Sequence, residues 1–268
     1  MTTALRLEPR TRSAPFRVLA VVLDRAHARV FAVTPTTVAE IADIESPATR
    51  GGRFHSDRHG APGGGERAFH QRLEEESRRH FLDVIRVLTT ALVGHPDDEV
   101  FLAGPGPYAT VFERHIPVDL KHRIIGTEQM NPLDATPAVV AAVVRDAKRH
   151  HQHQAEQAVM AAVAEGVGTG MATNGVRETL HALGHGQVRA LIIHPHARCT
   201  GFRCLKTGRL AMSRWDYPGE GPAREVADVI RAAAREAVRQ RADVILIQDP
   251  TVAREVDGLA ALLRFKEG

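Results

Sequence analysis

The residues best suited to chemistry lie in a stretch, 46–65, that combines six glycines with three arginines and two histidines and shows no hydrophobic periodicity. Glycine lets a backbone approach a ligand closely, and arginine pairs with phosphate through a bidentate fork. Loops of about twenty residues without secondary structure are generally functional or disordered. We interpret the stretch as a cationic loop that contacts RNA phosphates through Arg50, Arg53, Arg58, Arg67 and Arg72. The alternative is a flexible surface loop without a partner.

The histidines in and near this loop raise the question of acid–base or metal chemistry, because imidazole serves both. Asp57 is the one acidic residue among 46–65, and a single carboxylate does not make a hydrolytic metal site. A nucleotide P-loop is excluded, because Glu66-Arg67 stands where that motif requires Lys-Ser or Lys-Thr. We interpret the four histidines as solvent-exposed polar residues or phosphate contacts, namely His55, His59, His70 and His80.

A second group of nitrogen and sulfur side chains comprises His194, His196, Cys199 and Cys204, and these residue types can bind zinc. The chain has two cysteines in all, which excludes a four-thiolate site and a disulfide framework. We interpret the hairpin that follows as one held by packing, with Trp215 as its anchor. We therefore expect no metal at these four residues, and no cofactor.

The elements on either side of the loop must position it. A stripe of apolar residues at spacings of three and four predicts a long helix from Glu66 to about Val93. Thr136-Pro137 predicts the start of a second long helix, which continues to about Val163. Runs of β-branched and apolar residues predict strands, the first three forming a meander, at 16–24, 28–34, 37–44, 99–103 and 123–126.

The four glycines within Gly166–Gly175 predict a domain boundary. Beyond it helices and strands alternate, which is typical of a three-layer α/β domain. The expected elements are a helix at 176–183, a strand at 188–193, an irregular hairpin between 199 and 217, a helix at 225–239, a strand at 244–248 and a last helix or strand at 258–265.

Length and composition limit the classes of protein. A chain of 268 residues predicts two domains, and no apolar run approaches the roughly 20 residues that span a bilayer. Without such a run or a signal peptide, we expect a soluble, cytoplasmic protein with no membrane partner. Aromatic residues are 4% of the chain, which argues against base recognition by several stacked aromatic side chains. The net charge of +3 understates the local charge, because residues 1–29 contain six arginines and two acidic residues.

Several short motifs, in this order, resemble those of the archaeo-eukaryotic class-1 release factor and Pelota superfamily, in particular its bacterial members. The resemblance covers roughly residues 16–265 and depends on the order and spacing of the motifs. The motifs are Arg50-Gly51-Gly52-Arg53, the entry into the helix at 66–74, Ala103-Gly104-Pro105, Glu178-Thr179-Leu180, Gly186-Gln187-Val188, Leu191-Ile192-Ile193, Gly201-Phe202-Arg203-Cys204 and 258–265.

The resemblance implies an α/β fold with two domains. An RNase H-like central domain is expected over 16–165, with the Gly-rich loop 46–65 between a strand and a helix. A Pelota/ribosomal-protein-L7Ae-like three-layer α/β C-terminal domain is expected over 175–268, and residues 1–15 are expected to be a flexible tail. The codon-inspecting N-terminal domain of the family is missing, so stop-codon decoding is not expected.

The loop departs from the pattern of the releasing members. In those proteins the glycine pair is followed by a glutamine that helps to place a water molecule at the peptidyl-tRNA ester. Here Arg53 follows Gly51-Gly52, and arginine carries a permanent charge and offers no carbonyl acceptor. The nearest glutamine, Gln71, lies inside the predicted helix. The relatives' hairpin carries paired cysteines like a zinc ribbon, and Thr207 stands in the place of one of them.

Three functions follow from the resemblance. The first is a factor that binds the ribosome or tRNA and acts by A-site occupancy in rescue, hibernation or stress, with a translational GTPase as a possible partner and no small-molecule substrate. We favour this non-enzymatic role. The second is a peptidyl-tRNA hydrolase in which the backbone of Gly51, Gly52 and Arg53 stabilises an oxyanion and His55 or His59 assists a water molecule. The third is an adaptor unconnected with translation.

Overall fold

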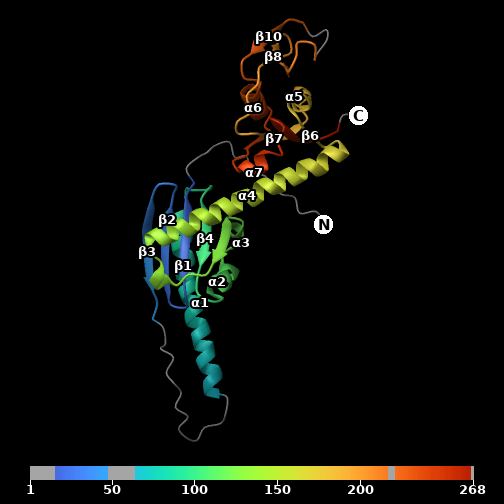
Figure 1. Ribbon diagram of the computed structural model, residues 1–268. Helices are drawn as coiled ribbons and strands as arrows, with labels where there is room; N and C mark the ends of the chain where they lie inside the picture. The colour runs from blue at the N-terminus through green and yellow to red at the C-terminus, as the bar shows by residue number, and fades with distance from the viewer. Residues whose placement is uncertain (1–15, 48–63, 217–220, 267–268) are drawn as a thin grey trace. The chain divides into compact units, whose positions relative to one another are not determined.

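The computed structural model describes residues 16–47, 64–216 and 221–266, with the backbone alone for 64–70. The chain divides into two compact units, one before and one after the boundary between His151 and Gln152. In each unit a β-sheet lies between helices (Figure 1). The α/β class predicted from the sequence is therefore confirmed.

The first unit is built on a mixed five-stranded sheet with the order β3-β2-β1-β4-β5. β1, β2 and β3 form the predicted antiparallel meander, and β4 and β5 continue the sheet in parallel with β1. The elements are β1 Val18–Leu23, β2 His27–Val33, β3 Val38–Glu45, α1 Gly64–Leu92, β4 Glu99–Ala103, α2 Tyr108–His115, α3 Val118–Lys121, β5 Ile124–Glu128, the short 3-10 helix η1 Pro132–Asp134 and α4 Pro137–Thr169.

The central strand β1 explains this arrangement. All six of its residues are fully buried, so both faces of the sheet need a hydrophobic cover. On one face α1, α2 and α3 supply side chains such as Phe81, Leu88 and Phe112. On the other face the first half of α4 supplies Val140 and Val144. The result is a three-layer unit in which α1 and α4 lie on opposite sides of the sheet (Figure 1).

The second unit is a three-layer α/β structure, as expected. Its four-stranded sheet has the order β11-β7-β12-β6, with α5 and α6 on one face and α7 and the second half of α4 on the other. A small antiparallel sheet, β10-β8-β9, is inserted after β7. The elements are β6 Ala172–Asn174, α5 Val176–Gly184, β7 Val188–Ile193, β8 Gly201–Cys204, β9 Leu210–Ala211, β10 Ala223–Val226, α6 Val229–Arg239, β11 Asp243–Leu246, α7 Pro250–Ala253 and β12 Leu259–Leu263.

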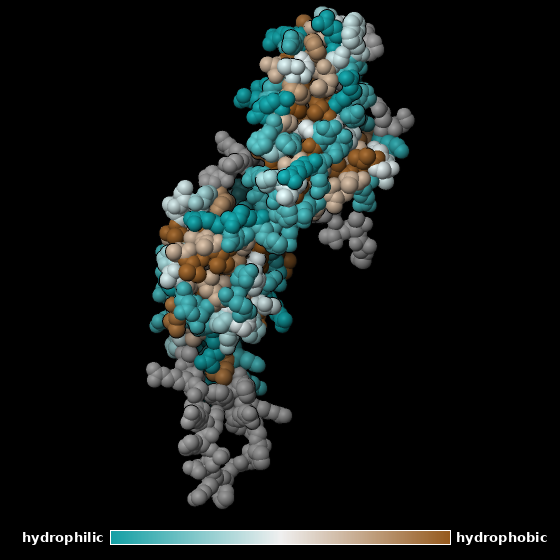
Figure 2. Space-filling view, viewed as in Figure 1, coloured by the Kyte–Doolittle hydropathy of each residue, from teal (hydrophilic) through white to brown (hydrophobic). Residues whose placement is uncertain are grey.

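Helix α4 begins at Pro137, as Thr136-Pro137 predicts, and belongs to both units. In the first unit the Lys148 ammonium lies 2.5 and 2.7 Å from the two carboxylate oxygens of the buried Glu99. In the second unit the buried Glu156 carboxylate accepts hydrogen bonds from the backbone N–H groups of Gln248 and Asp249. Hydrophilic residues cover the outward surface of the middle of α4 (Figure 2).

The expected boundary at Gly166–Gly175 differs from the observed division inside α4, after His151. The reason is that α4 continues to Thr169 and includes two of the glycines. Two other expected elements are refined. Residues 223–226 form β10, and α6 begins at Val229 because the Asp228 carboxylate caps it. The sequence left open whether the segment 258–265 is a helix or a strand. In the structure it contains the strand β12.

None of the helices in the described parts of the chain is long and apolar enough to cross a membrane.

Two glycines in the last turns of α4 give a matched test of the packing. A Cβ on Gly166 would lie 2.6 Å from the Cβ of Ala172, whereas a Cβ on Gly168 would meet nothing within 4 Å. Gly166→Ala should therefore lower the free energy of unfolding by about 1–3 kcal/mol. Gly168→Ala should raise it by about 0.5–1 kcal/mol, because alanine favours the helix. Urea titration of both variants measures the difference, and equal effects would contradict the close packing of Gly166.

Candidate functional site

The structure describes the flanks of the Gly-rich stretch. The predicted catalytic and RNA-contacting residues within it, Gly51, Gly52, Arg53, His55, His59, Arg50 and Arg58, lie outside the described residues. Of the other two predicted RNA contacts, Arg67 belongs to α1, described there by its backbone alone, and Arg72 is exposed on α1. The preceding flank ends at Ser46 and Pro47, directly after β3.

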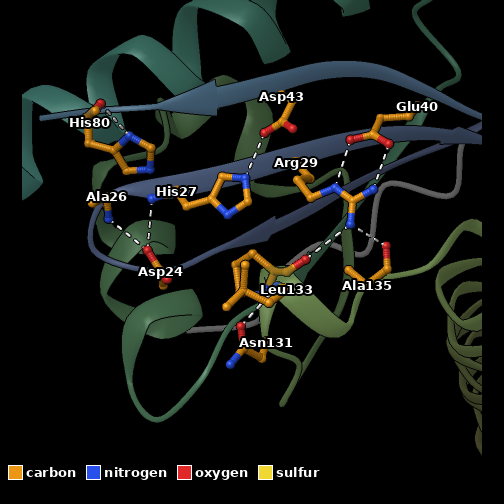
Figure 3. Close-up of polar contacts among 12 residues, drawn as sticks. Asp24, Ala26, His27, Arg29, Glu40, Asp43, His80, Asn131, Leu133 and Ala135 are labelled. Atoms are coloured by element: carbon orange, nitrogen blue, oxygen red, sulfur yellow. Dashed lines mark hydrogen bonds and ion pairs between the residues drawn. The ribbon is translucent and has the colours of Figure 1, made fainter.

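Ser46 ties the preceding flank to the body of the first unit. Its backbone N–H donates to the carbonyl of Ala26 at 2.7 Å, and its hydroxyl lies 2.8 Å from Nδ1 of His80 on α1. Asp24 shapes the β1–β2 turn that carries Ala26, because its carboxylate accepts from the N–H groups of Ala26 and His27 at 2.8 Å each (Figure 3). The chain therefore leaves the sheet from a point fixed by the turn and by α1.

His80 is fully buried, which corrects the interpretation that it is solvent-exposed. Its Nε2 atom is buried and has no hydrogen-bond partner within the described part of the chain. Burial lowers the pKa of His80, against smaller raising effects of the His27 carbonyl and of the Asp24 and Asp83 charges. A neutral, enclosed imidazole cannot reach a substrate, so His80 positions Ser46 and α1 instead of serving as an acid or base.

Charged side chains on the neighbouring strands β2 and β3 pair with one another (Figure 3). Arg29 on β2 forms a bidentate pair with Glu40 on β3, at 2.8 and 2.7 Å, and donates to the carbonyls of Pro132 and Ala135. The Glu40 carboxylate raises the pKa of the Arg29 guanidinium. His27 lies 2.7 Å from Asp43. These residues connect the sheet edge to the segment before α4.

Helix α1 has no net charge, because its five arginines are matched by five acidic residues. Glu75 contacts Arg78 at 3.1 Å and Arg79 at 3.2 Å, and Asp83 contacts Arg86 at 2.8 Å. By contrast, residues 46–65 contain three arginines and one aspartate. The cationic character of this part of the molecule therefore belongs to the Gly-rich stretch and not to the helix that follows it.

The hairpin residues do not assemble into a metal site. The described residues contain no group of three or more His, Cys, Asp or Glu side chains that could hold a metal ion. The Nδ1 atom of His194 accepts from the N–H of His196, and Cys204 is buried. Burial raises the pKa of the Cys199 thiol, with a further contribution from Asp228, which favours the protonated form over the thiolate that binds metals.

Trp215 is 77% exposed, which corrects the expectation that it anchors the hairpin. The side chain that covers the hairpin is Arg214, whose guanidinium carbon lies 5.6 Å from the centre of the Phe202 ring. The Asp216 carboxylate accepts from the N–H groups of Met212 and Ser213 and so closes a tight turn. Trp215 lies within this turn, between Ser213 and Asp216, and is exposed there.

A histidine of α4, His153, pairs with an aspartate from a distant part of the chain. His150, His151 and His153 lie close together in the middle of α4, a pattern that by itself indicates a solvent-exposed helix face. In the structure His153 lies 2.7 Å from the carboxylate of Asp249, which caps α7. The partner is 96 residues away in the sequence, so no local pattern indicates it.

Comparison with known proteins gives one family match, over the first unit, and structural matches that cover both units. A model of bacterial archaeo-eukaryotic release factor family 10 matches residues 10–152, which include the Gly-rich stretch, α1 and the five-stranded sheet. No curated protein matches the sequence.

Among solved structures, S. cerevisiae Dom34 matches with a TM-score of 0.56 and 14% identity, over 93% of this chain and 64% of Dom34. An archaeal Pelota, in a model of ribosome-bound Pelota and ABCE1, matches with a TM-score of 0.52 and 17% identity, over 99% of this chain and 65% of that one. The chain thus spans just under two thirds of either protein. These similarities extend the shared fold across both units.

The burial of His80 predicts a pH dependence. The lowered pKa means that the unfolded chain, in which His80 titrates near 6.5, binds a proton more readily than the folded chain. The contribution of His80 to stability is therefore complete above the unfolded pKa and is lost as the pH falls below about 6.5, by at most about 1.4 kcal/mol per pH unit. Urea titrations between pH 5 and pH 7.5 measure the effect.

The control compares two histidine variants. His80→Leu should flatten the pH dependence of unfolding, whereas His122→Gln, at an exposed position, should leave it unchanged. An unaltered pH profile in His80→Leu would show that His80 titrates normally in the folded protein.

Proposed function

The chain belongs to bacterial archaeo-eukaryotic release factor family 10, and on this basis we propose that it is a translation factor that binds the ribosome or tRNA. In this proposal it acts by occupying the A site during rescue, hibernation or stress, and it does not read stop codons. Its partners are ribosomal RNA, tRNA or both. The observation that carries the proposal is that the family match spans the Gly-rich stretch together with the sheet and helix that position it.

Electrostatics support a contact with RNA phosphates through the stretch itself. The arginines of α1 are offset by acidic residues of the same helix, and Arg29 on β2 is paired with Glu40 on β3. Arg50, Arg53 and Arg58 stand among residues with a single aspartate. Phosphate binding by such a loop is electrostatic and hence sensitive to salt.

Occupancy is favoured over catalysis because of the residue types available. Arg53 stands where the resemblance places the glutamine of releasing members, and its guanidinium has no acceptor for a water proton. His80, the histidine nearest to the stretch whose side chain is described, is enclosed in the core. His55 and His59 remain the residues on which a hydrolase would depend.

The neighbouring structures suggest a partner protein. Dom34 is described as a translation termination-like factor that acts in RNA quality control and interacts with Hbs1. The archaeal Pelota is described as ribosome-bound together with ABCE1. We extend this to the present chain as a proposal that a partner factor, of which a translational GTPase is one candidate, binds alongside it on the ribosome.

Removal of the three loop charges tests the RNA contact. The triple variant Arg50→Gln, Arg53→Gln and Arg58→Gln should co-sediment less with ribosomes. It should also reduce the slope of log binding constant against log salt by about 2 to 3, at roughly 0.7–0.9 for each phosphate that the protein no longer neutralises.

The control lowers the net charge equally at exposed positions elsewhere on the first unit, through Arg86→Gln, Arg114→Gln and Lys121→Gln. This variant should retain the slope of the unmodified protein. Equal losses of ribosome binding in the two triple variants would show that binding responds to overall charge. Unchanged binding in both would show that the Gly-rich stretch does not contact the ribosome through these arginines.

A peptide-release assay separates occupancy from hydrolysis. Purified protein in excess over ribosome-bound peptidyl-tRNA should release peptide no faster than the uncatalysed background, because Arg53 cannot accept a proton from water. Arg53→Gln is the matched variant, and release by this variant alone would identify Arg53 as the reason for inactivity. Release by the unmodified protein would establish the hydrolase function instead.

A further inference from the structure

The second unit contains a cavity of about 520 Å³ next to α5. The volume lies within the range of roughly 300–1,000 Å³ that is typical of small-ligand sites. The walls come from α5, from the ends of β6 and β12, from β9 and from the residue that precedes β7. The lining includes the apolar Leu180, Leu210 and Leu263, the polar Gln187 and the cationic Arg177 and Lys266.

Gln187 is the buried polar residue of this cavity. It is 3% exposed, and its backbone N–H and C=O are bonded to Ala182 and Arg264 respectively. The side-chain amide makes no hydrogen bond to the described residues, and neither of its polar atoms is sealed from solvent. Because the amide is open to the cavity, water can reach it while the cavity is empty. An occupant that displaces this water must supply both a donor and an acceptor, since leaving a buried amide without a partner costs about 1–3 kcal/mol.

The walls and the rim restrict the occupant further. Leu180, Leu210 and Leu263 are 1%, 2% and 8% exposed and give the cavity broad apolar surfaces. At the rim, Arg177 is paired with Asp216, whose carboxylate also accepts two backbone N–H groups. Lys266 also lines the cavity, and it forms no ion pair with any described residue. The lining also includes Thr173, Glu178 and His181. Among the described residues, the site thus combines apolar walls, one buried amide and a rim of mixed charge on which Lys266 is the cation that can bind an anion.

We propose that this cavity binds an adenine nucleotide. The base lies between the leucine side chains, its N6 amino group and N7 pair with the Gln187 amide, and its phosphate pairs with Lys266. A glutamine amide matches the donor and acceptor of adenine in this bidentate way. An aliphatic side chain of a protein partner would fill the same walls but leave the amide unpaired. The inference goes beyond the proposed function, because nucleotide binding does not depend on whether the protein binds ribosomes.

The experiment titrates the full chain with AMP, adenosine, GMP and a short oligoadenylate RNA. Calorimetry measures the affinity, and the fluorescence of Trp215, the one tryptophan in the chain and the neighbour of Asp216, provides a second readout. AMP should bind more tightly than adenosine and GMP. Binding of AMP assigns the site to free nucleotides, and binding of oligoadenylate without AMP assigns it to an unpaired RNA base. Absence of binding by both at millimolar concentration overturns the proposal.

Two variants locate the binding in the cavity. Gln187→Leu should weaken AMP binding at least tenfold, and Lys266→Gln should weaken AMP binding several-fold while leaving adenosine binding unchanged. Lys206→Gln, an exposed lysine that does not line the cavity, is the matched control and should bind as the unmodified protein does. If Gln187→Leu does not fold, AMP binding is measured with Gln187→Met instead. The affinities of Lys266→Gln for AMP and adenosine then provide the second test of whether the nucleotide lies in the cavity. Unchanged AMP affinity in the folded Gln187 variant overturns the proposal.

Discussion

The complete burial of β1 is the constraint on which the first unit depends. A strand without a solvent-exposed residue requires helices on both faces of its sheet, so α1 and α4 must lie on opposite sides. This requirement places His80 of α1 beneath the end of β3, where it meets Ser46. The starting point of the Gly-rich stretch is therefore set by the core of the sheet and not by the stretch itself.

The net charge of +3 does not show that the charges are distributed unevenly between the scaffold and the Gly-rich stretch. Within α1, and between β2 and β3, acidic and basic side chains neutralise each other and stabilise local structure, as Glu75 does with Arg78 and Arg79. Exposed pairs of this kind contribute about 0–1 kcal/mol each, so their main effect is to neutralise the scaffold. Against that neutral background, a short run of arginines can dominate the electrostatic field that an RNA phosphate meets.

Sequence reasoning succeeded where the signal is local and repetitive. The meander, both long helices and the alternation in the second unit follow from hydrophobic periods of two and about 3.6 residues, and Thr136-Pro137 located the start of α4. It was less successful where a partner is distant. The hydrogen-bond partner of the buried His80 is a serine 34 residues away, and the partner of His153 is an aspartate 96 residues away. Trp215 was assigned to packing by its type, whereas the turn around Asp216 leaves it exposed.

By itself the sequence determined the α/β class, the order of most elements, the family resemblance and the cationic composition of residues 46–65. Each of these depends only on the types and spacing of residues that are close together in the chain. Only the tertiary structure decided which polar groups are buried, which charges are neutralised and which residues share a cavity. Gln187 illustrates the difference: in the sequence it is part of a short motif before a strand, and only the packing of α5, β9 and β12 buries its side chain beside a cavity. Burial and pairing are properties of the packed chain, since they depend on contacts between segments far apart in sequence.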